Sequence, residues 1–378
     1  MNFLFVCGGT AGHINPAIAI ATELRRSLPD AKILFVGAGK ELEKKLIPRA
    51  GYHVLKIRMS GLQRGFTADD LIHNIITVRN MATAGFEASN LLHRYKPAAV
   101  IGTGGYICYP VMRRAALMGI PTVIHESNAI PGLTTKLLSA SVDRVLVSFP
   151  GLEKQYRRPE RVFFTGTPVR AGFGAALDDD EPAETDRKPR VVSFWGSLGA
   201  ERMNETMAEF IKLNIDSGEF DHIHATGKAG GVDEMKKRLA RLGAPDVMPA
   251  GIEISEYIDD MPSVMSAADI VLSRAGASTV AELTVMGKPA VLIPSPYVAN
   301  NHQEENAKQL QKTGGAVMLL EKECTGENLF NTVSQLLKDK DRLERMSFAQ
   351  KSLAAPEAAS IIVDMIIRLC GGKGPYHG

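Results

Sequence analysis

The stretch FLFVCGGTAGHINPAIAIATEL, residues 3–24, decides the fold. Its first four residues read as a fully buried strand, a glycine-rich turn follows at residues 8–13, and the remainder repeats apolar residues at helical spacing. Asn15 is expected to cap this helix and Pro16 to be its first residue. Such a strand-to-helix junction points backbone N–H groups and the positive end of a helix at one spot, so it suits phosphate or another polyanion.

A second junction of this kind lies a domain's length away. GSLGA, residues 196–200, also follows an apolar strand and opens a helix. Neither glycine segment is the dinucleotide fingerprint GxGxxG, and neither has the Lys-Ser/Thr ending of a P-loop. Each loop taken singly also fits a tight turn that only lets a helix pack on a strand. Together the two junctions predict two halves of nucleotide-binding type.

Short β-branched runs alternate with amphipathic stretches through the whole chain, which indicates repeated βαβ units. The expected strands are residues 3–6, 33–36, 54–57, 98–101, 122–125, 144–147 and 162–165 in the first half, and 191–194, 222–225, 251–254, 270–273, 290–293 and 316–319 in the second. We therefore predict an α/β fold with two Rossmann-like domains. Because ligands bind at the carboxyl ends of parallel strands, the two sheets would face one another across a cleft.

Composition shifts suggest the domain boundaries. We expect an N-terminal domain at 1–166, a linker at 167–190, a C-terminal domain at 191–345, and terminal helices at 346–378 that pack back on the first domain. The linker is rich in Asp, Glu, Ala and Pro and has no apolar periodicity. Its acidic triplet, Asp178 to Asp180, lacks further ligands at metal-binding spacing, so it reads as solvated chain.

The overall composition is that of an ordinary globular enzyme. Hydrophobic residues make up 45% of the 378 residues and charged residues 23%, and the net charge of +2 gives no argument for nucleic acid. The four cysteines form no CxxC or Cys/His cluster, which predicts neither a disulfide framework nor a zinc site and fits a reducing cytoplasm. No stretch approaches the roughly 18 apolar residues of a membrane span, and the apolar N-terminal run reads as a strand rather than a signal peptide.

Polar side chains follow several of the expected strands. His13 ends the first glycine loop, where an imidazole can take a proton from a bound hydroxyl or can simply cap the helix. Residues 125–128, His-Glu-Ser-Asn, gather four polar side chains at one strand end. In the second half, Glu282 lies about one turn into a helix after SRAGAST, where an acid can chelate a vicinal diol or act as a plain first-turn glutamate. The segment 300–306, rich in amides and with one imidazole, suits the hydroxyls of a sugar.

In this order, the segments resemble the glycosyltransferase B superfamily, and within it the family of UDP-N-acetylglucosamine transferases that complete the lipid-linked peptidoglycan precursor. The resemblance covers nearly all of the chain. The motifs that carry it are GGTAGH (8–13), GTGGY (102–106), GIPTVIHESNAIPGLTTK (119–136), GTPVR (166–170), GSLGA (196–200), YIDDM (257–261), SRAGASTVAE (273–282) and HQEENA (302–307).

The resemblance places the UDP-N-acetylglucosamine donor mainly on the second half. Ser197 and the helix start after it would hold the diphosphate, Arg170 would neutralise charge or touch the nucleotide, and Ile258 would pair with the uracil through its backbone. Glu282 would bind the ribose diol. The residues expected along the diphosphate and sugar are Ala277, Ser278, Thr279, Val280 and Ala281, and those expected to read the sugar hydroxyls are Gln303 and Asn306.

The first half would take the lipid acceptor, through Thr10, Ala11, Gly12, His13, Glu126 and Asn128. The activity implied is an inverting transfer of N-acetylglucosamine to the 4-hydroxyl of the muramic acid of lipid I, an undecaprenyl-diphosphate-linked muramyl peptide, giving lipid II for cell-wall synthesis. His13 is the leading candidate for the base and Glu126 the alternative. The resemblance implies no metal and no cofactor.

The sequence departs from the family's usual pattern at four positions: Ala11 for Gly, Ser127 for Gln, Thr167 for Asn and Leu198 for Gln. The first exchange requires a negative φ at Ala11. None of the four removes a proposed charge or proton carrier.

A polyprenyl acceptor implies a peripheral protein at the cytoplasmic face of the cell membrane, with cell-wall and division proteins as further partners. The candidate membrane surface is Leu62 to Phe86, where apolar residues lie among arginines, although an ordinary buried helix shows the same spacing.

Two other functions stay open on the sequence. A different UDP-sugar enzyme of the same scaffold, such as a natural-product glycosyltransferase or a UDP-sugar 2-epimerase, would keep the donor half and differ in the first domain. A non-catalytic nucleotide-sugar-binding scaffold of the cell-wall machinery is the third possibility, and a turnover assay separates it from both enzymes.

Overall fold

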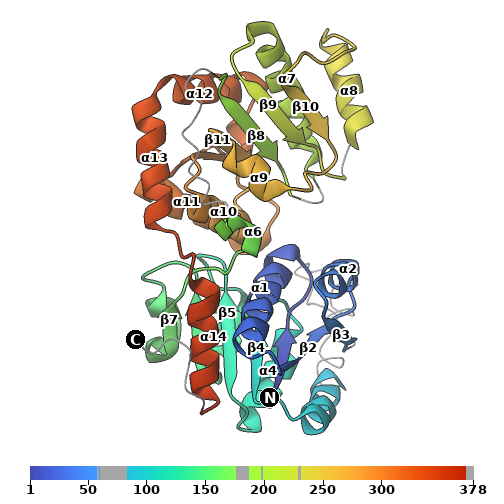
Figure 1. Ribbon diagram of the computed structural model, residues 1–378, viewed down its shortest axis with the longest axis vertical. Coiled ribbons are helices and arrows are strands. Elements are labelled where there is room, and N and C mark those ends of the chain that lie inside the picture. The colour runs from blue at the N-terminus through green and yellow to red at the C-terminus, as the bar shows by residue number, and fades with distance from the viewer. Residues whose placement is uncertain (58, 60–82, 176–186, 197–198, 229–230, 372–378) are drawn as a thin grey trace, which may run out of the picture. The chain divides into compact units, whose positions relative to one another are not determined.

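The computed structural model describes residues 1–57, 59, 83–175, 187–196, 199–228 and 231–371. The chain divides into two compact units (Figure 1): Met1–Arg170 with Ala355–Gly378 form the first, and Ala171–Ala354 form the second. Residues 346–354, which the sequence-based boundaries grouped with the returning segment, therefore belong to the second unit.

The first unit holds a parallel sheet in the order β3-β2-β1-β4-β5-β6-β7. Its strands are β1 (Asn2–Val6), β2 (Lys32–Gly37), β3 (His53–Lys56), β4 (Ala99–Gly102), β5 (Thr122–Glu126), β6 (Arg144–Val147) and β7 (Val162–Phe164). Its helices are α1 (Ala11–Ser27), α2 (Glu41–Arg49), α4 (Cys108–Leu117), α5 (Leu133–Leu138) and α14 (Ala358–Leu369), with short 3-10 turns η1 (Glu153–Gln155) and η2 (Pro159–Arg161).

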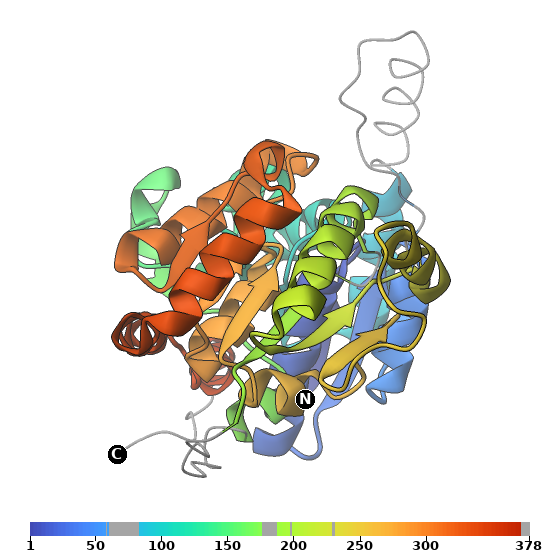
Figure 2. The same ribbon diagram turned by 90° about the horizontal axis from the view of Figure 1, so that it is seen from above.

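The second unit repeats the plan with a parallel sheet in the order β10-β9-β8-β11-β12-β13. Its strands are β8 (Arg190–Phe194), β9 (Asp221–Ala225), β10 (Ile252–Ser255), β11 (Ile270–Ser273), β12 (Ala290–Leu292) and β13 (Ala316–Met318). Its helices are α6 (Ala171–Ala175), α7 (Glu201–Ser217), α8 (Gly231–Arg241), α9 (Met261–Ser266), α10 (Ala277–Met286), α11 (His302–Thr313), α12 (Gly326–Lys338) and α13 (Lys340–Ser352), with 3-10 turns η3 (Ala299–Asn301) and η4 (Glu321–Glu323). Helices cover both faces of this sheet (Figure 2).

Every predicted strand is present, shifted by at most one residue at either end, and all the pairings are parallel. The prediction of two parallel α/β units is thus confirmed. The reason is that strands buried on both faces read as continuous apolar runs, which glycine turns then bound.

The core of the first unit explains the place of the C-terminal helix. Phe5 stacks on Phe35 with ring centroids 5.2 Å apart, and both pack in one fully buried cluster with α1 and α14. Ile362 and Ile366 of α14 are fully buried there. Helix α14 therefore completes the first hydrophobic core, although it lies at the far end of the chain.

Two local predictions are corrected. Helix α1 begins at Ala11 with Thr10 as its N-cap, so Asn15 is not the cap and Pro16 lies inside the helix. Pro16 has no N–H to donate to the Gly12 carbonyl, and on the next carbonyl, that of His13, the Thr103 hydroxyl donates a hydrogen bond at 2.6 Å. In the expected linker, residues 171–175 form helix α6, which packs on α10, and the acidic triplet lies outside the described residues.

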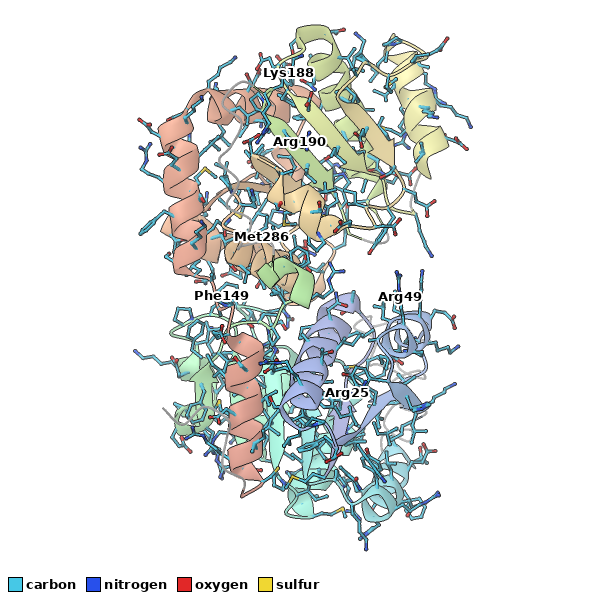
Figure 3. All side chains as sticks on the ribbon, in the orientation of Figure 1. Arg25, Arg49, Phe149, Lys188, Arg190 and Met286 are labelled. Carbon is cyan, nitrogen blue, oxygen red and sulfur yellow. The ribbon has the colours of Figure 1, made fainter. Side chains whose placement is uncertain are left out.

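Asp269 accepts several hydrogen bonds at the amino edge of the second sheet. Its carboxylate accepts from the backbone N–H of Arg190 at 2.6 Å and from Nη1 of Arg187 at 2.7 Å. Arg190 and its neighbour Lys188, which bonds the carbonyl of Gly218 at 3.0 Å, are labelled in Figure 3. Asp269 therefore ties the segment before β8 to the start of β11 at the amino edge of the sheet.

Two fully buried histidines lie in the core of the second unit. The Ser193 hydroxyl contacts Nε2 of His222 at 2.8 Å and Nδ1 of His224 at 2.7 Å. Burial lowers the pKa of His224 to about 3, and burial with the neighbouring His224 lowers the pKa of His222 well below its ordinary value. Both rings are therefore neutral in the folded protein.

Acid should accordingly destabilise the second unit. The unfolded histidines bind protons below pH about 6.5 and the folded ones do not, so each should remove about 1 kcal/mol between pH 6.5 and 5.5. Urea unfolding followed by fluorescence of the one tryptophan, Trp195, which is buried in this unit, measures the effect. His222→Phe should reduce the slope of stability against pH by one proton; equal slopes in variant and wild type would contradict this account.

Candidate active site

The candidate residues lie where the strand order reverses. In the first sheet β1 pairs with β2 on one side and with β4 on the other, and in the second sheet β8 pairs with β9 and β11. Open α/β sheets bind ligands at such reversals, beyond the carboxyl ends of the strands. The loops after β1 and β4 and those after β8 and β11 hold most of the predicted residues.

His13 is the third residue of α1, and its side chain is half-buried. Nδ1 lies 2.9 Å from the carbonyl oxygen of Gly8 and 3.3 Å from the Thr10 hydroxyl. A carbonyl can only accept, so Nδ1 carries the proton and Nε2 keeps its lone pair. Within the described chain Nε2 has no hydrogen-bond partner, so the imidazole can accept a proton from a ligand.

The loop after β4 fits closely against this ring. A Cβ added at Gly104 would lie 2.4 Å from Cδ2 and 2.8 Å from Nε2 of His13, and Gly104 has a φ of +114°. A Cβ added at Gly105 would lie 2.6 Å from the Gly8 carbonyl oxygen. Only glycine permits this approach, a requirement that the sequence reading of GTGGY did not assign to His13.

Thr10, Ala11 and Gly12 lie beside His13 at the start of α1. The helix has no side-chain cap, and the N–H groups of Ala11 and Gly12 have no partner among the described residues. Ala11 is not among the residues with positive φ, so the exchange of glycine for alanine is tolerated as expected. This helix start offers two backbone donors next to the imidazole.

Glu126 is buried and has both oxygens engaged. Oε1 accepts from the backbone N–H and the side-chain amide of Asn128, each at 3.1 Å. Oε2 accepts from the N–H of Gly132 at 3.0 Å and from the Thr135 hydroxyl at 2.7 Å. Two donors from Asn128 and two at the start of α5 make this carboxylate an anchor for the 126–132 loop, whereas His13 has an open nitrogen.

The other polar side chains after β5 form a buried network. His125 lies with Nε2 2.9 Å from the Gly166 carbonyl, its pKa is lowered by burial, and Ser127 contacts its Nδ1 at 3.3 Å. Thr167 donates to the Ser148 hydroxyl at 2.5 Å, and Ser148 donates to the Glu126 carbonyl at 2.9 Å. Two of the departures from the family pattern, Ser127 and Thr167, thus have partners inside the first unit.

Helix α10 presents its start in the second unit. Its N-cap is Gly276, with no side-chain cap, and the N–H groups of Ala277, Ser278 and Thr279 have no partner among the described residues. The N–H of Val280 donates to the Gly276 carbonyl at 2.9 Å. The side chains of Val280 and Ala281 are buried. Three open amides at the positive end of a helix suit a diphosphate. Glu282 lies buried further along α10, at 7% exposure.

The loop before α10 is fixed by Arg274 and Glu321, which the sequence reading missed, and by Asn306, which it assigned another role. Arg274 is buried and pairs with the buried Glu321 at 2.6 Å while donating to the Ile293 carbonyl at 3.0 Å. Asn306, expected to read a sugar hydroxyl, is fully buried and donates its amide to the Ala275 carbonyl at 3.1 Å. An arginine within SRAGAST was a sign in the sequence that a charged side chain fixes this loop. No pattern in the sequence pointed to its partner Glu321, which lies 47 residues further on.

The remaining predicted residues lie on segments other than the loops after β1 and β11, or outside the described residues. Gln303 accepts from the Ser295 N–H at 2.9 Å and so holds the loop after β12. Ile258 buries its side chain, while its backbone N–H and carbonyl have no partner in the described residues. Arg170 is exposed at the end of the first unit. Ser197 and Leu198 lie outside the described residues, as does the candidate membrane stretch up to residue 82; Phe86 at its end is 70% exposed.

Two domain models of one glycosyltransferase family together match most of the chain. The glycosyltransferase family 28 N-terminal domain matches residues 3–147 and the family 28 C-terminal domain matches residues 191–362. The chain belongs to glycosyltransferase family 28.

Among its relatives are proteins named UDP-N-acetylglucosamine–N-acetylmuramyl-(pentapeptide) pyrophosphoryl-undecaprenol N-acetylglucosamine transferase. The one from Acetivibrio thermocellus is 41% identical over 374 residues, 97% of each chain, and the one from Bacillus cytotoxicus is 36% identical over 98% of this chain and 99% of its own. The solved structure of Acinetobacter baumannii MurG superposes with a TM-score of 0.75 at 27% identity, covering 97% of this chain and 100% of that one. A UDP-GlcNAc 2-epimerase from Neisseria meningitidis, at 14% identity and a TM-score of 0.68 over 97% of this chain and 100% of its own, shares the fold.

The contacts of Glu126 predict a structural penalty for its loss. Glu126→Ala leaves buried donors of the 126–132 loop without an acceptor and should lower the free energy of unfolding by about 2 to 4 kcal/mol. His13→Ala, with one short bond to a carbonyl, should change it by less than about 1 kcal/mol. Thermal unfolding followed by circular dichroism compares the two; equal stabilities would rule out the anchoring role.

Proposed function

We propose that the protein transfers N-acetylglucosamine from UDP-N-acetylglucosamine to the 4-hydroxyl of the muramic acid of lipid I, with inversion at the anomeric carbon, to give lipid II. The observation that carries this proposal is that both halves of the chain match one glycosyltransferase family while the two units differ in chemistry. The first unit offers a histidine with an open nitrogen, and the second offers open amides at a helix start.

The acceptor hydroxyl is activated in the first unit. As its oxygen attacks the anomeric carbon, Nε2 of His13 takes the proton and Nδ1–H keeps its bond to the Gly8 carbonyl. The resulting imidazolium is stabilised by that carbonyl. Asn128 and the Ala11 and Gly12 amides are placed to bind acceptor oxygens, and Glu126 shapes the loop that carries Asn128.

The donor is bound by the second unit. The N–H groups of Ala277, Ser278 and Thr279 take up charge that develops on the leaving diphosphate, which is where preorganised donors lower the barrier most. Ser197 and Arg170 add to this charge stabilisation. Glu282 binds the ribose diol and Ile258 reads the uracil through its open backbone groups. Gln303 offers its side-chain N–H to a sugar hydroxyl, and Asn306 acts by holding the 274–276 loop.

The direct test is incubation with UDP-N-acetylglucosamine and a short-chain lipid I analogue. The expected products are UDP and a disaccharide-bearing lipid. Formation of UDP-N-acetylmannosamine in the absence of acceptor, or of its hydrolysis products UDP and N-acetylmannosamine, would indicate a 2-epimerase. Transfer only to a different acceptor would indicate another glycosyltransferase, and binding without turnover would indicate a scaffold.

His13→Ala should lower kcat by about 10²- to 10⁴-fold, because the attacking hydroxyl loses its base. The KM for UDP-N-acetylglucosamine should change little, since the donor lies on the other unit. Steady-state kinetics at saturating acceptor measure both constants.

Glu282→Ala should show the opposite pattern, with the main effect on donor binding. Losing charge-assisted hydrogen bonds to the ribose should raise the dissociation constant for UDP roughly ten- to 150-fold, as measured by calorimetry.

The choice of base is tested by comparing Glu126→Ala with His13→Ala. If Glu126→Ala abolished kcat without loss of stability while His13→Ala retained it, the roles of base and loop anchor would have to be exchanged.

The lipid acceptor requires contact with a bilayer, and we place the protein peripherally at the cytoplasmic face. Within the described residues no helix is long and apolar enough to cross a membrane. Helices α4 and α5 pack together and expose Leu117, Leu133 and Leu137 at 63%, 54% and 52%. Arg113, Arg114 and Lys136 are exposed on the same helices. Apolar side chains flanked by cations suit an anionic lipid surface.

Replacing Leu117 and Leu137 by serine should weaken binding to anionic phospholipid vesicles. Each leucine contributes roughly 1 kcal/mol of apolar burial, so the double variant should bind roughly 30-fold more weakly in sedimentation. Activity on a soluble acceptor analogue should persist. Phe348→Ser, which removes a 76% exposed side chain from the second unit, is the control and should bind vesicles like the wild type; unchanged binding of the leucine variant would exclude this face.

A further inference from the structure

Glu43 is a fully buried carboxylate that the proposed chemistry does not use. It is the third residue of α2 and is 0% exposed. Oε2 accepts from the N–H of Lys40 at 3.0 Å, the usual contact of an N3 glutamate with the N-cap residue, and from the N–H of Gly39 at 2.6 Å. These contacts account for one of its two oxygens.

The other oxygen reaches a different loop. Oε1 accepts from the Gly9 N–H at 3.0 Å, 34 residues away in the sequence. A Cβ added at Gly8 would lie 2.9 Å from this oxygen, and one added at Gly37 would lie 2.4 Å from Oε2. Within the described residues Glu43 forms no ion pair, so backbone N–H groups alone compensate its burial.

The Gly9 N–H belongs to the same peptide group as the Gly8 carbonyl. That carbonyl accepts from Nδ1 of His13 at 2.9 Å. A single peptide plane therefore joins the Glu43 carboxylate on one side to the imidazole on the other. A carboxylate that polarises the N–H makes the opposite carbonyl a better acceptor, because hydrogen bonds in a chain strengthen one another.

We propose that Glu43 is a positioning residue for His13, acting through the Gly8–Gly9 peptide to fix the Nδ1–H tautomer and leave Nε2 as the base. The proposal rests on the proposed role of His13 in the transfer. Its logic is that of a carboxylate orienting a catalytic histidine, with one peptide group placed between them.

Glu43→Gln breaks the outer contact selectively. Two N–H groups converge on the Oε2 position and only one on Oε1, so the glutamine oxygen should stay with Gly39 and Lys40 while its NH₂ group faces the Gly9 N–H. We expect kcat to fall about 10- to 100-fold, the loss that is typical when a group that orients a metal-binding histidine through its other ring nitrogen is removed. The KM for UDP-N-acetylglucosamine should change less than about twofold.

Asp143→Asn is the matched control. Asp143 also accepts from a backbone N–H and a hydroxyl, both of Thr122 and both at 2.9 Å, but at the amino edge of the same sheet. Its loss should affect stability and leave kcat unchanged. Equal losses of kcat in both variants would reduce Glu43 to a stability residue.

Nitrogen NMR of histidine-labelled protein tests the tautomer without any turnover. In the wild type the His13 signals, assigned by their absence in His13→Ala, should report a protonated Nδ1, and in Glu43→Gln they should shift toward a mixture of tautomers. A wild-type His13 protonated at Nε2, or a Glu43→Gln spectrum unchanged at His13, would overturn the proposal even if the variant were inactive. Absence of turnover in the wild type, with the expected spectra, would instead count against the proposed function alone.

Discussion

The chain reverses its direction of winding beside β1 and beside β8, and most of the candidate contacts with a ligand lie at these two reversals. From β1 it proceeds outward to β2 and β3 and then returns to β4 on the other side, and from β8 it does the same before β11. Right-handed crossovers in opposite directions send the following helices to opposite faces of the sheet. Backbone donors at the starts of α1 and α10 are therefore left without partners at the carboxyl edges.

Buried carboxylates hold the loops at these edges. Glu43 joins the loops after β1 and β2, Glu126 fixes the loop between β5 and α5, and Glu321 pairs with Arg274 beside the start of α10. Each is almost fully buried and is met by backbone N–H groups, a hydroxyl or a guanidinium. Removing one partner of such a contact costs more than the contact contributes, so loop geometry is coupled to the stability of each unit.

From the sequence we could predict two parallel sheets and the types of residue in the site. We could not predict which hydrogen-bond partners hold those residues in place. Strands such as 3–6 were recognisable because they are buried on both faces, and family motifs located His13 and Glu282. The start of α1 was misplaced because Pro16 resembles a first helical residue, whereas Thr10 is the cap. The link from Glu43 to Gly9 and the fit of Gly104 on His13 join segments 34 and 91 residues apart, and no local pattern encodes such distances.

Neither Gly8 nor Gly9 carries a Cβ, so the orientation of the peptide between them is held by its two hydrogen bonds, one to Glu43 and one to His13. In the inverted orientation the Gly8 carbonyl would face the Glu43 carboxylate, and the Gly9 N–H would face Nδ1 of His13, which would then have to hold its proton on Nε2. On the proposed role of His13, only the observed orientation leaves Nε2 able to take a proton. The Glu43 carboxylate favours this orientation, and each 1.4 kcal/mol of preference, roughly, would change the ratio of the two orientations tenfold. The tautomer of the imidazole would thus be set by the protein itself before any substrate arrives.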